Sequence, residues 1–240
     1  MEKTVTVDLS QNSFRSGSAY AGSDTKHATQ EWHVSSRNAD GAILPELRTL
    51  RDRSRDIERN NPIARGALKA MLSGVVGSGL RPRAAIDREM LGLSEEQAQA
   101  WQNRAEQEFR VWSESTYSDY MGELNFFGLQ KLAYYSQKTS GDCFVLLPYD
   151  ARPGAPYDLR VQLIESDRVC NKDGASDTDE IAGGIERDKD GKPVAIYIRT
   201  PHPGATYFSM LNTAPTWKRV PIFGERTGRR NVIHLTPIFA

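Results

Sequence analysis

The sequence predicts an α+β fold in which N-terminal helices precede a mostly antiparallel, β-rich segment. Apolar residues recur at helical spacing before Gly141, whereas short runs rich in β-branched and aromatic residues follow from Cys143. The 240 residues suffice for one large domain or two small ones, and a hydrophobic content of 38% suits a folded chain. We expect a flexible arm over residues 1–36, helices over 37–141 and strands over 142–240.

The N-terminal arm is rich in Ser, Thr, Gly and Asn. This composition is typical of a segment that hangs free or orders only against a neighbour. It contains no long apolar run, so neither a signal peptide nor a membrane anchor is predicted.

Four helices are predicted from periodicity and end signals. Pro62 suits the first position of a helix capped by Asn61, because that position needs no backbone N–H. Ser94 and Gln97 have the spacing of a capping box. The expected bounds are Leu44 to Arg59, a start at Pro62, Ser94 to about Ser113, and Asn125 to Gly141.

Two tryptophans, Trp101 and Trp112, share one face of the third predicted helix with other apolar residues. This spacing favours a place in the core over a binding platform.

Five runs are predicted strands: CFVLLP, LRVQLI, IAGGIER, VAIYIRT and NVIHL. The turn sequence KDGK predicts an antiparallel hairpin between IAGGIERD and PVAIYIRT. Residues 201–230 are rich in Pro and Gly and are interpreted as a loop. We expect its aromatic residues to pin it onto the sheet; they are Tyr207, Phe208, Trp217 and Phe223.

The charge of the chain is balanced, with 31 basic and 31 acidic residues. No overall field therefore attracts nucleic acid or an anionic membrane. Between Arg37 and Arg88, however, the sequence contains eleven basic residues and only six acidic ones. This excess is typical of a solvated helix face, but Arg51, Arg55 and Arg59 are also candidates for contact with DNA or a neighbouring subunit.

No motif for catalysis, cofactor binding or metal binding is found. GVVGSGL follows a predicted helix, whereas a phosphate loop leads from a strand into one. Glu165 and Asp167 are the most enzyme-like carboxylates, because they follow a predicted strand. Without a partner base, the favoured interpretation is a turn in which they cap backbone N–H groups or pair with Arg168.

The two cysteines, Cys143 and Cys170, form neither a metal-binding pair nor a disulfide framework. Cys143 lies in an apolar run, which predicts a buried thiol and favours a reducing compartment.

Six segments in a fixed order carry a resemblance to a known family. They begin with RSRDIERNNPIARGALKAMLSGVVGSGLRPRAAID and continue with LGLSEEQAQAWQNRAEQEFRVWSES, LNFFGLQKLAYYSQKTSGDCFVLLPY, LRVQLIESDRV, GGIERDKDGKPVAIYIRTPHPG and NVIHL. In this order they resemble the portal proteins of lambda-type tailed phages and prophages. The resemblance extends from about Trp32 to Leu235, which makes it more specific than any short motif.

The resemblance implies a portal wing-like region and a structural subunit without enzymatic activity. Such subunits form a ring, usually a dodecamer, at one capsid vertex, through which double-stranded DNA is packaged and later ejected. The implied partners are other copies of the chain, the packaging terminase, head-completion proteins and capsid proteins. The implied location is the virion, with assembly in the host cytoplasm.

Family members are considerably longer than this chain. The stem, clip and crown are therefore expected to be missing, as in a truncated piece, a shortened gene or a processed fragment.

Two other functions remain open at the level of sequence. One is a sequence-nonspecific DNA-binding protein that uses the arginine face of the first two helices. The other is a small-ligand or enzyme module at the Glu165 to Arg168 turn, which would require a pocket joining that turn to the Gly-rich GVVGSGL segment.

Overall fold

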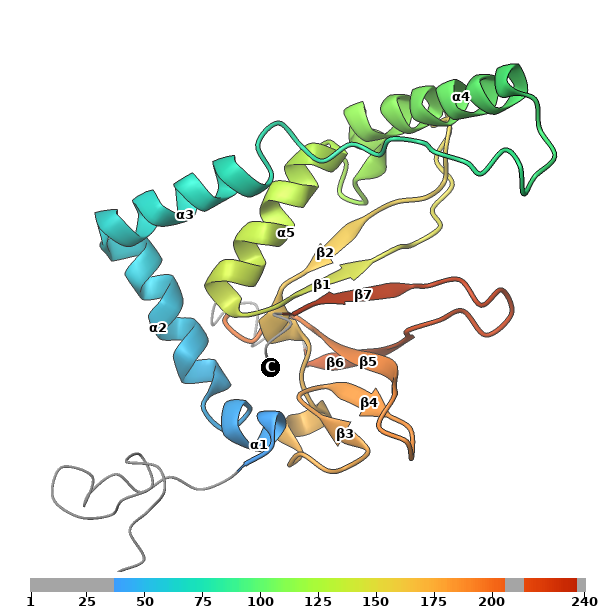
Figure 1. Cartoon of the computed structure of the whole chain (residues 1–240). Helices are drawn as coiled ribbons and strands as arrows, with labels where there is room; N and C mark the ends of the chain where they lie inside the picture. Colours follow the sequence, from blue (N-terminus) through green and yellow to red (C-terminus); the bar gives the residue numbers. More distant parts are fainter. Residues whose placement is uncertain (1–36, 206–213, 237–240) are drawn as a thin grey trace, which may run out of the picture. The chain divides into compact units, whose positions relative to one another are not determined.

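The computed structural model describes residues 37–205 and 214–236. Within them the chain folds into five α-helices and two antiparallel sheets, which confirms the predicted α+β class (Figure 1). The predicted arm over residues 1–36 lies outside the described residues. The α-helices are α1 (Ala39–Ile43), α2 (Leu47–Asn60), α3 (Pro62–Val75), α4 (Glu95–Glu114) and α5 (Phe126–Ser140).

Asn61 forms the corner between α2 and α3. Its side-chain Oδ1 accepts hydrogen bonds from the backbone N–H groups of Ile63 at 2.9 Å and Ala64 at 3.2 Å. Pro62 occupies the first turn, where a missing N–H leaves no hydrogen bond unmade. The predicted break between the first two helices is therefore confirmed.

The ends of α4 and α5 also follow the sequence signals. Ser94 Oγ accepts from the backbone N–H of Gln97 at 3.2 Å, and Gln97 Oε1 accepts from that of Ser94 at 2.9 Å. Asn125 caps the start of α5, and Gly141 ends it in the left-handed region at φ 88°. The predicted capping box and the predicted bounds of the fourth helix are confirmed.

The strands form two sheets. In the first, β1 pairs antiparallel with β2 on one side and with β7 on the other. In the second, the strand order is β3-β4-β5-β6. The strands are β1 (Cys143–Leu146), β2 (Gln162–Ile164), β3 (Ile181–Ala182), β4 (Ile185–Arg187), β5 (Pro193–Thr200), β6 (Thr216–Pro221) and β7 (Val232–Leu235), with short 3₁₀ turns η4 (Thr116–Ser118), η5 (Ser166–Arg168) and η6 (Lys172–Gly174).

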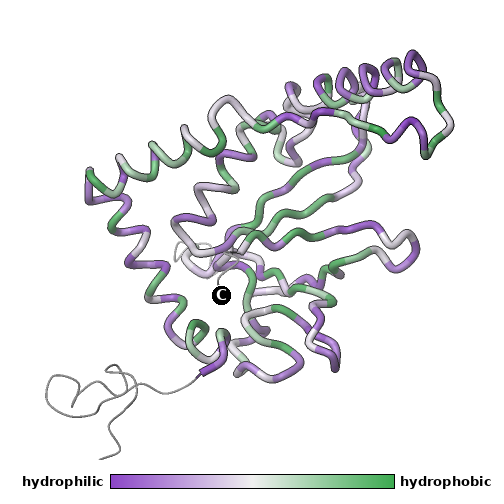
Figure 2. The backbone as a smooth tube through the Cα atoms, viewed as in Figure 1, coloured by the Kyte–Doolittle hydropathy of each residue, from purple (hydrophilic) through white to green (hydrophobic). Residues whose placement is uncertain are grey.

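The first sheet is buried on both faces. Phe144 of β1 packs with residues of the second sheet such as Ile196, whereas Cys143 and Val145 pack with Leu129 of α5. This alternation follows from the two-residue period of a strand. The strands of this sheet are accordingly hydrophobic along much of their length, as Figure 2 shows. Burial raises the pKa of the Cys143 thiol to about 11, in agreement with its predicted place in the core.

The predicted hairpin across KDGK is confirmed, because β4 and β5 pair antiparallel on either side of it. The run IAGGIER, however, is not one strand. Gly183 and Gly184 divide it into β3 and β4, which pair with each other. Two consecutive glycines at positive φ give this tight turn its backbone conformation.

The interpretation of residues 201–230 as a loop is wrong in part. Residues Thr216–Pro221 form β6, which pairs with β5 along its whole length. Its sequence, TWKRVP, contains two adjacent basic residues and ends in proline. It is therefore more polar than the runs predicted as strands. Trp217 lies in this strand and Phe223 is partly exposed, whereas Tyr207 and Phe208 lie outside the described residues.

An ion pair links the edge strand β6 to β4 across β5. Arg219 donates two hydrogen bonds of 2.8 Å to the carboxylate of Glu186, which also accepts from the Tyr197 hydroxyl at 2.8 Å. The hydrogen bond from Arg219 is the largest influence on Glu186 and lowers its pKa to about 2. Lys218, next to Arg219, adds a second exposed cation to this edge.

The two tryptophans of α4 differ in their surroundings. Trp112 packs against Phe109 and Phe126, with ring centroids 5.7 and 4.9 Å away. Trp101, nearer the start of the helix, is 55% exposed. The core prediction is therefore wrong for Trp101, because α4 extends beyond the elements that cover its C-terminal half (Figure 1).

Gly79, in the GVVGSGL segment, supports a close packing contact. Its φ is +108°, and a Cβ at this position would lie 2.2 Å from Cδ1 and 2.7 Å from Cβ of Phe127. Phe127 is itself buried in α5. The glycine allows the chain after α3 to cross directly over the start of α5.

Replacing Gly79 with alanine should therefore destabilise the fold by about 2–4 kcal/mol, since positive-φ strain adds to overpacking. Gly92→Ala is the control, because its φ is +63° and no atom lies within 4 Å of the added Cβ. The control should cost only about 1 kcal/mol. Urea unfolding measures both, and equal losses would contradict the packing role.

Candidate functional site

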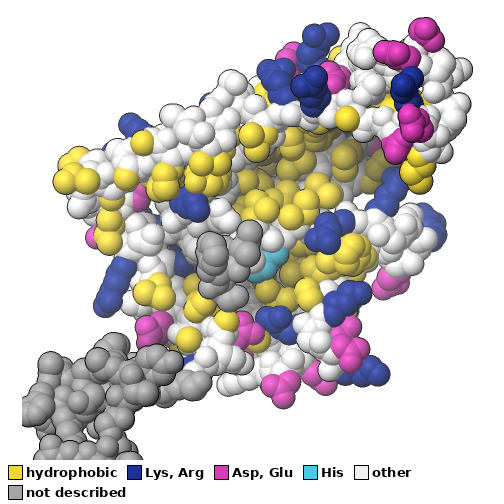
Figure 3. All heavy atoms as spheres, viewed as in Figure 1, with side chains coloured by type: hydrophobic (Ala, Val, Ile, Leu, Met, Phe, Trp, Pro, Cys, Tyr) yellow, Lys and Arg dark blue, Asp and Glu magenta, His cyan; other side chains and the backbone are white. Residues whose placement is uncertain are grey.

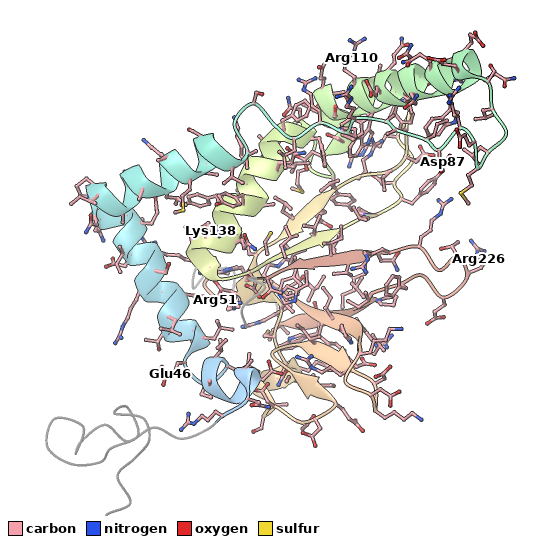
Figure 4. The ribbon with its side chains drawn as sticks, in the orientation of Figure 1. Glu46, Arg51, Asp87, Arg110, Lys138 and Arg226 are labelled. Atoms are coloured by element: carbon pink, nitrogen blue, oxygen red, sulfur yellow. The ribbon has the colours of Figure 1, made fainter. Side chains whose placement is uncertain are left out.

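Arg51 is buried inside the chain, with only 8% of its side chain exposed. Its Nη2 donates to Asp142 Oδ1 at 2.7 Å, and its Nε donates to the backbone oxygen of Ser140 at 3.0 Å. Ser140 is the last residue of α5, where carbonyl groups lack partners within the helix. Arg51 therefore connects α2 to the end of α5 and the start of β1 (Figure 4).

Arg55 lies one turn further along α2 and reaches the same region. Its Nη2 donates to Ser140 Oγ at 2.9 Å, and its Nη1 forms an ion pair with Asp167 of η5. Arg51 also lies 3.5 Å from Asp167. The two arginines thus face two carboxylates of the same chain, and we call these four residues the arginine–aspartate cluster.

Arg59, the third predicted contact residue, is exposed and stands apart from this cluster. No ion pair or side-chain hydrogen bond holds its guanidinium among the described residues, although its backbone oxygen accepts from Arg65 at 2.8 Å. The structure thus brings Arg51 and Arg55 together and leaves Arg59 at the surface. Contact of these arginines with DNA or a subunit stays a prediction.

Asp142 has a second side-chain partner besides Arg51. His234 Nε2 donates to its Oδ2 at 3.1 Å, and the imidazole stacks on Phe144 with ring centroids 4.2 Å apart. Burial raises the pKa of Asp142, but the hydrogen bond from His234 and the charge of Arg51 outweigh it, so the net pKa is lowered. No motif or spacing in the sequence indicated this role for Asp142.

The turn from Glu165 to Arg168 has a different pairing from the predicted one. Asp167 pairs with the two arginines of α2, whereas Arg168 Nε donates to the backbone oxygen of Arg199 at 3.0 Å. Of the two predicted arrangements, pairing with Arg168 is wrong for Asp167, because η5 directs the two side chains to different elements. Capping is not found for Glu165, which makes no side-chain cap hydrogen bond at the start of η5. His202 Nε2 lies 3.6 Å from Glu165 and 3.7 Å from Asp167.

An apolar groove of about 560 Å³ lies between α4, α5 and the first sheet. Hydrophobic side chains gather in this hollow beneath α4 in Figure 3. Its lining includes neither the Glu165 to Arg168 turn nor the GVVGSGL segment, so it is not the pocket that the ligand hypothesis requires. Its principal residues include Phe109, Trp112, Phe126, Leu129, Leu159 and Leu235.

Within the described ranges, no three His, Cys, Asp or Glu side chains are grouped as a metal site. No helix in this part of the chain is long and apolar enough to cross a membrane. The contacts of the arginine–aspartate cluster hold α2, α5, β1 and η5 together, which is a positioning role.

Replacing Arg51 with methionine should destabilise the fold by about 3–5 kcal/mol, because Asp142 would lose its buried partner. Arg53→Met is the matched control on the same helix, since Arg53 is exposed and has no ion pair among the described residues. It should change stability by no more than about 0.5 kcal/mol. Urea unfolding at neutral pH compares the two, and a small loss for Arg51→Met would contradict the connecting role.

Asp142 should also give the fold a specific pH dependence. Its pKa is lower in the folded chain than its ordinary value of 3.8, so the folded state binds fewer protons there. The resulting stability is present above that ordinary value and is lost as pH falls through the folded pKa. The stability difference between wild type and Asp142→Asn should therefore shrink in urea titrations below about pH 3.8; a constant difference would contradict this.

Comparison with known proteins identifies the same family that the six sequence segments resemble. The family model described as "Phage portal protein, lambda family" matches residues 25–237. Portal protein B of Escherichia phage lambda is 22% identical over 171 residues, which cover 70% of this chain and 32% of that protein. The chain thus spans about a third of the length of this relative. Because the family model matches far more than half of the chain, the protein belongs to the lambda family of phage portal proteins.

Proposed function

We propose that the chain is a structural subunit of the portal vertex, in which copies form a ring, a dodecamer by family resemblance. Double-stranded DNA would pass through this ring during packaging and ejection. The observation that carries the proposal is the family match over residues 25–237. The family is structural, and we propose that this chain likewise acts without catalysis.

The surface of α4 supports assembly with other chains. Only Ala98 and Ser113 of its twenty residues are buried. Trp101 and Val111 are large apolar side chains that remain exposed. The apolar side chains that α4 leaves exposed are better explained by contacts in an assembly than by the isolated chain.

We propose two different roles for Arg51, Arg55 and Arg59. Arg51 and Arg55 are held by carboxylates of the same chain, so their part is to position α2. Arg59 is the one of the three whose exposed guanidinium has room for a phosphate or for a carboxylate of a neighbouring subunit. Phosphate contacts of this kind are independent of sequence, as passage of a whole genome requires.

The remaining partners are proposed by family resemblance. They are the packaging terminase, head-completion proteins and capsid proteins. The proposed location is the portal vertex of the virion, after assembly in the host cytoplasm.

Deleting the gene from its phage or prophage should give capsids without a portal ring and without DNA, because the packaging channel would be missing. Electron microscopy of the particles and DNA measurement after nuclease treatment check this, and a plasmid copy of the gene should restore both. Capsids that package DNA normally after the deletion would overturn the proposal.

Complementing the deletion phage with a plasmid copy that carries Arg59→Glu tests the role of Arg59 with the same two measurements. Intact rings with reduced DNA retention indicate a phosphate contact, whereas loss of rings indicates a subunit contact. Normal rings with normal DNA content would show that Arg59 serves neither role. Lys189→Glu, at the exposed turn between β4 and β5, is the matched control.

A further inference from the structure

The α3 helix leaves an apolar face uncovered. It buries only Leu68, whereas Ile63 is 82% and Met71 42% exposed. Ile63, Ala67 and Met71 follow one another at intervals of four residues, so they share one face of the helix. An exposed face of this kind marks an interaction surface.

The apolar groove beneath α4 is complementary to this face of α3. It is open and lined almost entirely by apolar side chains, with Leu159 at its edge 45% exposed. Glu108 is the charged residue in its lining. Grooves of this type bind an amphipathic helix through anchors spaced three or four residues apart, which is the spacing on α3.

The charges of the two surfaces are opposite. α3 contains Arg65 and Lys69 but no acidic residue; Arg65 pairs with Glu58 of α2, which leaves Lys69 as the unpaired cation of α3 among the described residues. α4, which forms one wall of the groove, contains five acidic residues and two basic ones. Complementary charge favours contact between α3 of one molecule and the groove of another over contact between like surfaces.

We propose that α3 of one copy docks into the α4 groove of a second copy, with Ile63 and Met71 as the anchors. The inference rests on the proposed function and names the surfaces through which copies of the chain join. The two surfaces differ, so the contact is heterologous: a copy offers its groove to one neighbour and its α3 to the next. Such contacts repeat into a ring where the rotation closes.

Two single substitutions test this contact, each at an exposed position so that the fold is kept. Ile63→Asp places a charge on the α3 anchor, and Leu159→Asp places one at the groove edge. Each should raise the dissociation constant for self-association at least about tenfold, because a carboxylate would be buried without a partner. Sedimentation velocity over a range of concentrations measures the change, and circular dichroism verifies folding.

A mixture of the two variants tests the pairing of α3 with the groove more specifically than either variant alone. Ile63→Asp retains an intact groove and Leu159→Asp retains an intact α3, so an equimolar mixture should form one-to-one dimers and nothing larger. Met90→Asp is the matched control, because Met90 is 85% exposed and lies outside both surfaces. This control should assemble like the wild type.

Several outcomes would overturn the proposal. These are wild-type assembly by either variant, a mixture that stays monomeric, a wild-type chain that stays monomeric, or a wild-type chain that stops at dimers. The proposed function is judged separately by the deletion phage. If that phage lacks DNA while both variants assemble normally, the interface is wrong and the portal role stands; if it packages DNA, the portal role itself fails.

Discussion

Arg51 connects parts of the chain that lie far apart in sequence. From α2 it reaches the last carbonyl of α5, the carboxylate of Asp142 before β1 and, more distantly, Asp167 of η5. A buried guanidinium is tolerated only where such partners surround it, so the position of α2 is set by this contact. Because α3 continues from α2 at the Asn61 corner, the direction in which α3 presents its apolar face depends on the same ion pair.

Much of the fold could be predicted because its signals are local. The cap at Asn61, the capping box at Ser94 and the glycine after α5 depend on residues within a few positions of one another. β6 was missed for the opposite reason. Its residues resemble a loop, and they become a strand only because β5 offers a partner along their whole length, which is a non-local effect.

The candidate site could be predicted only in part. The arginine excess identified the right helix, but composition does not distinguish an arginine that faces solvent from one that meets a carboxylate about ninety positions away. Asp142 and His234 belong to no motif, and their meeting requires β1 and β7 to pair. The groove likewise exists only once α4, α5 and the first sheet are assembled, so periodicity placed Trp112 on the correct face without showing what lies beside it.

The charged edge of the second sheet affects what happens when copies of the chain meet in solution. An edge strand offers unpaired N–H and C=O groups to any extended segment, and the resulting cross-pairing leads to aggregation. Lys218 on β6 is an exposed cation that repels a like edge, Pro221 lacks a donor, and β3 at the opposite edge is only two residues long. Both edges of the second sheet are thereby protected from irreversible strand exchange between copies of the chain.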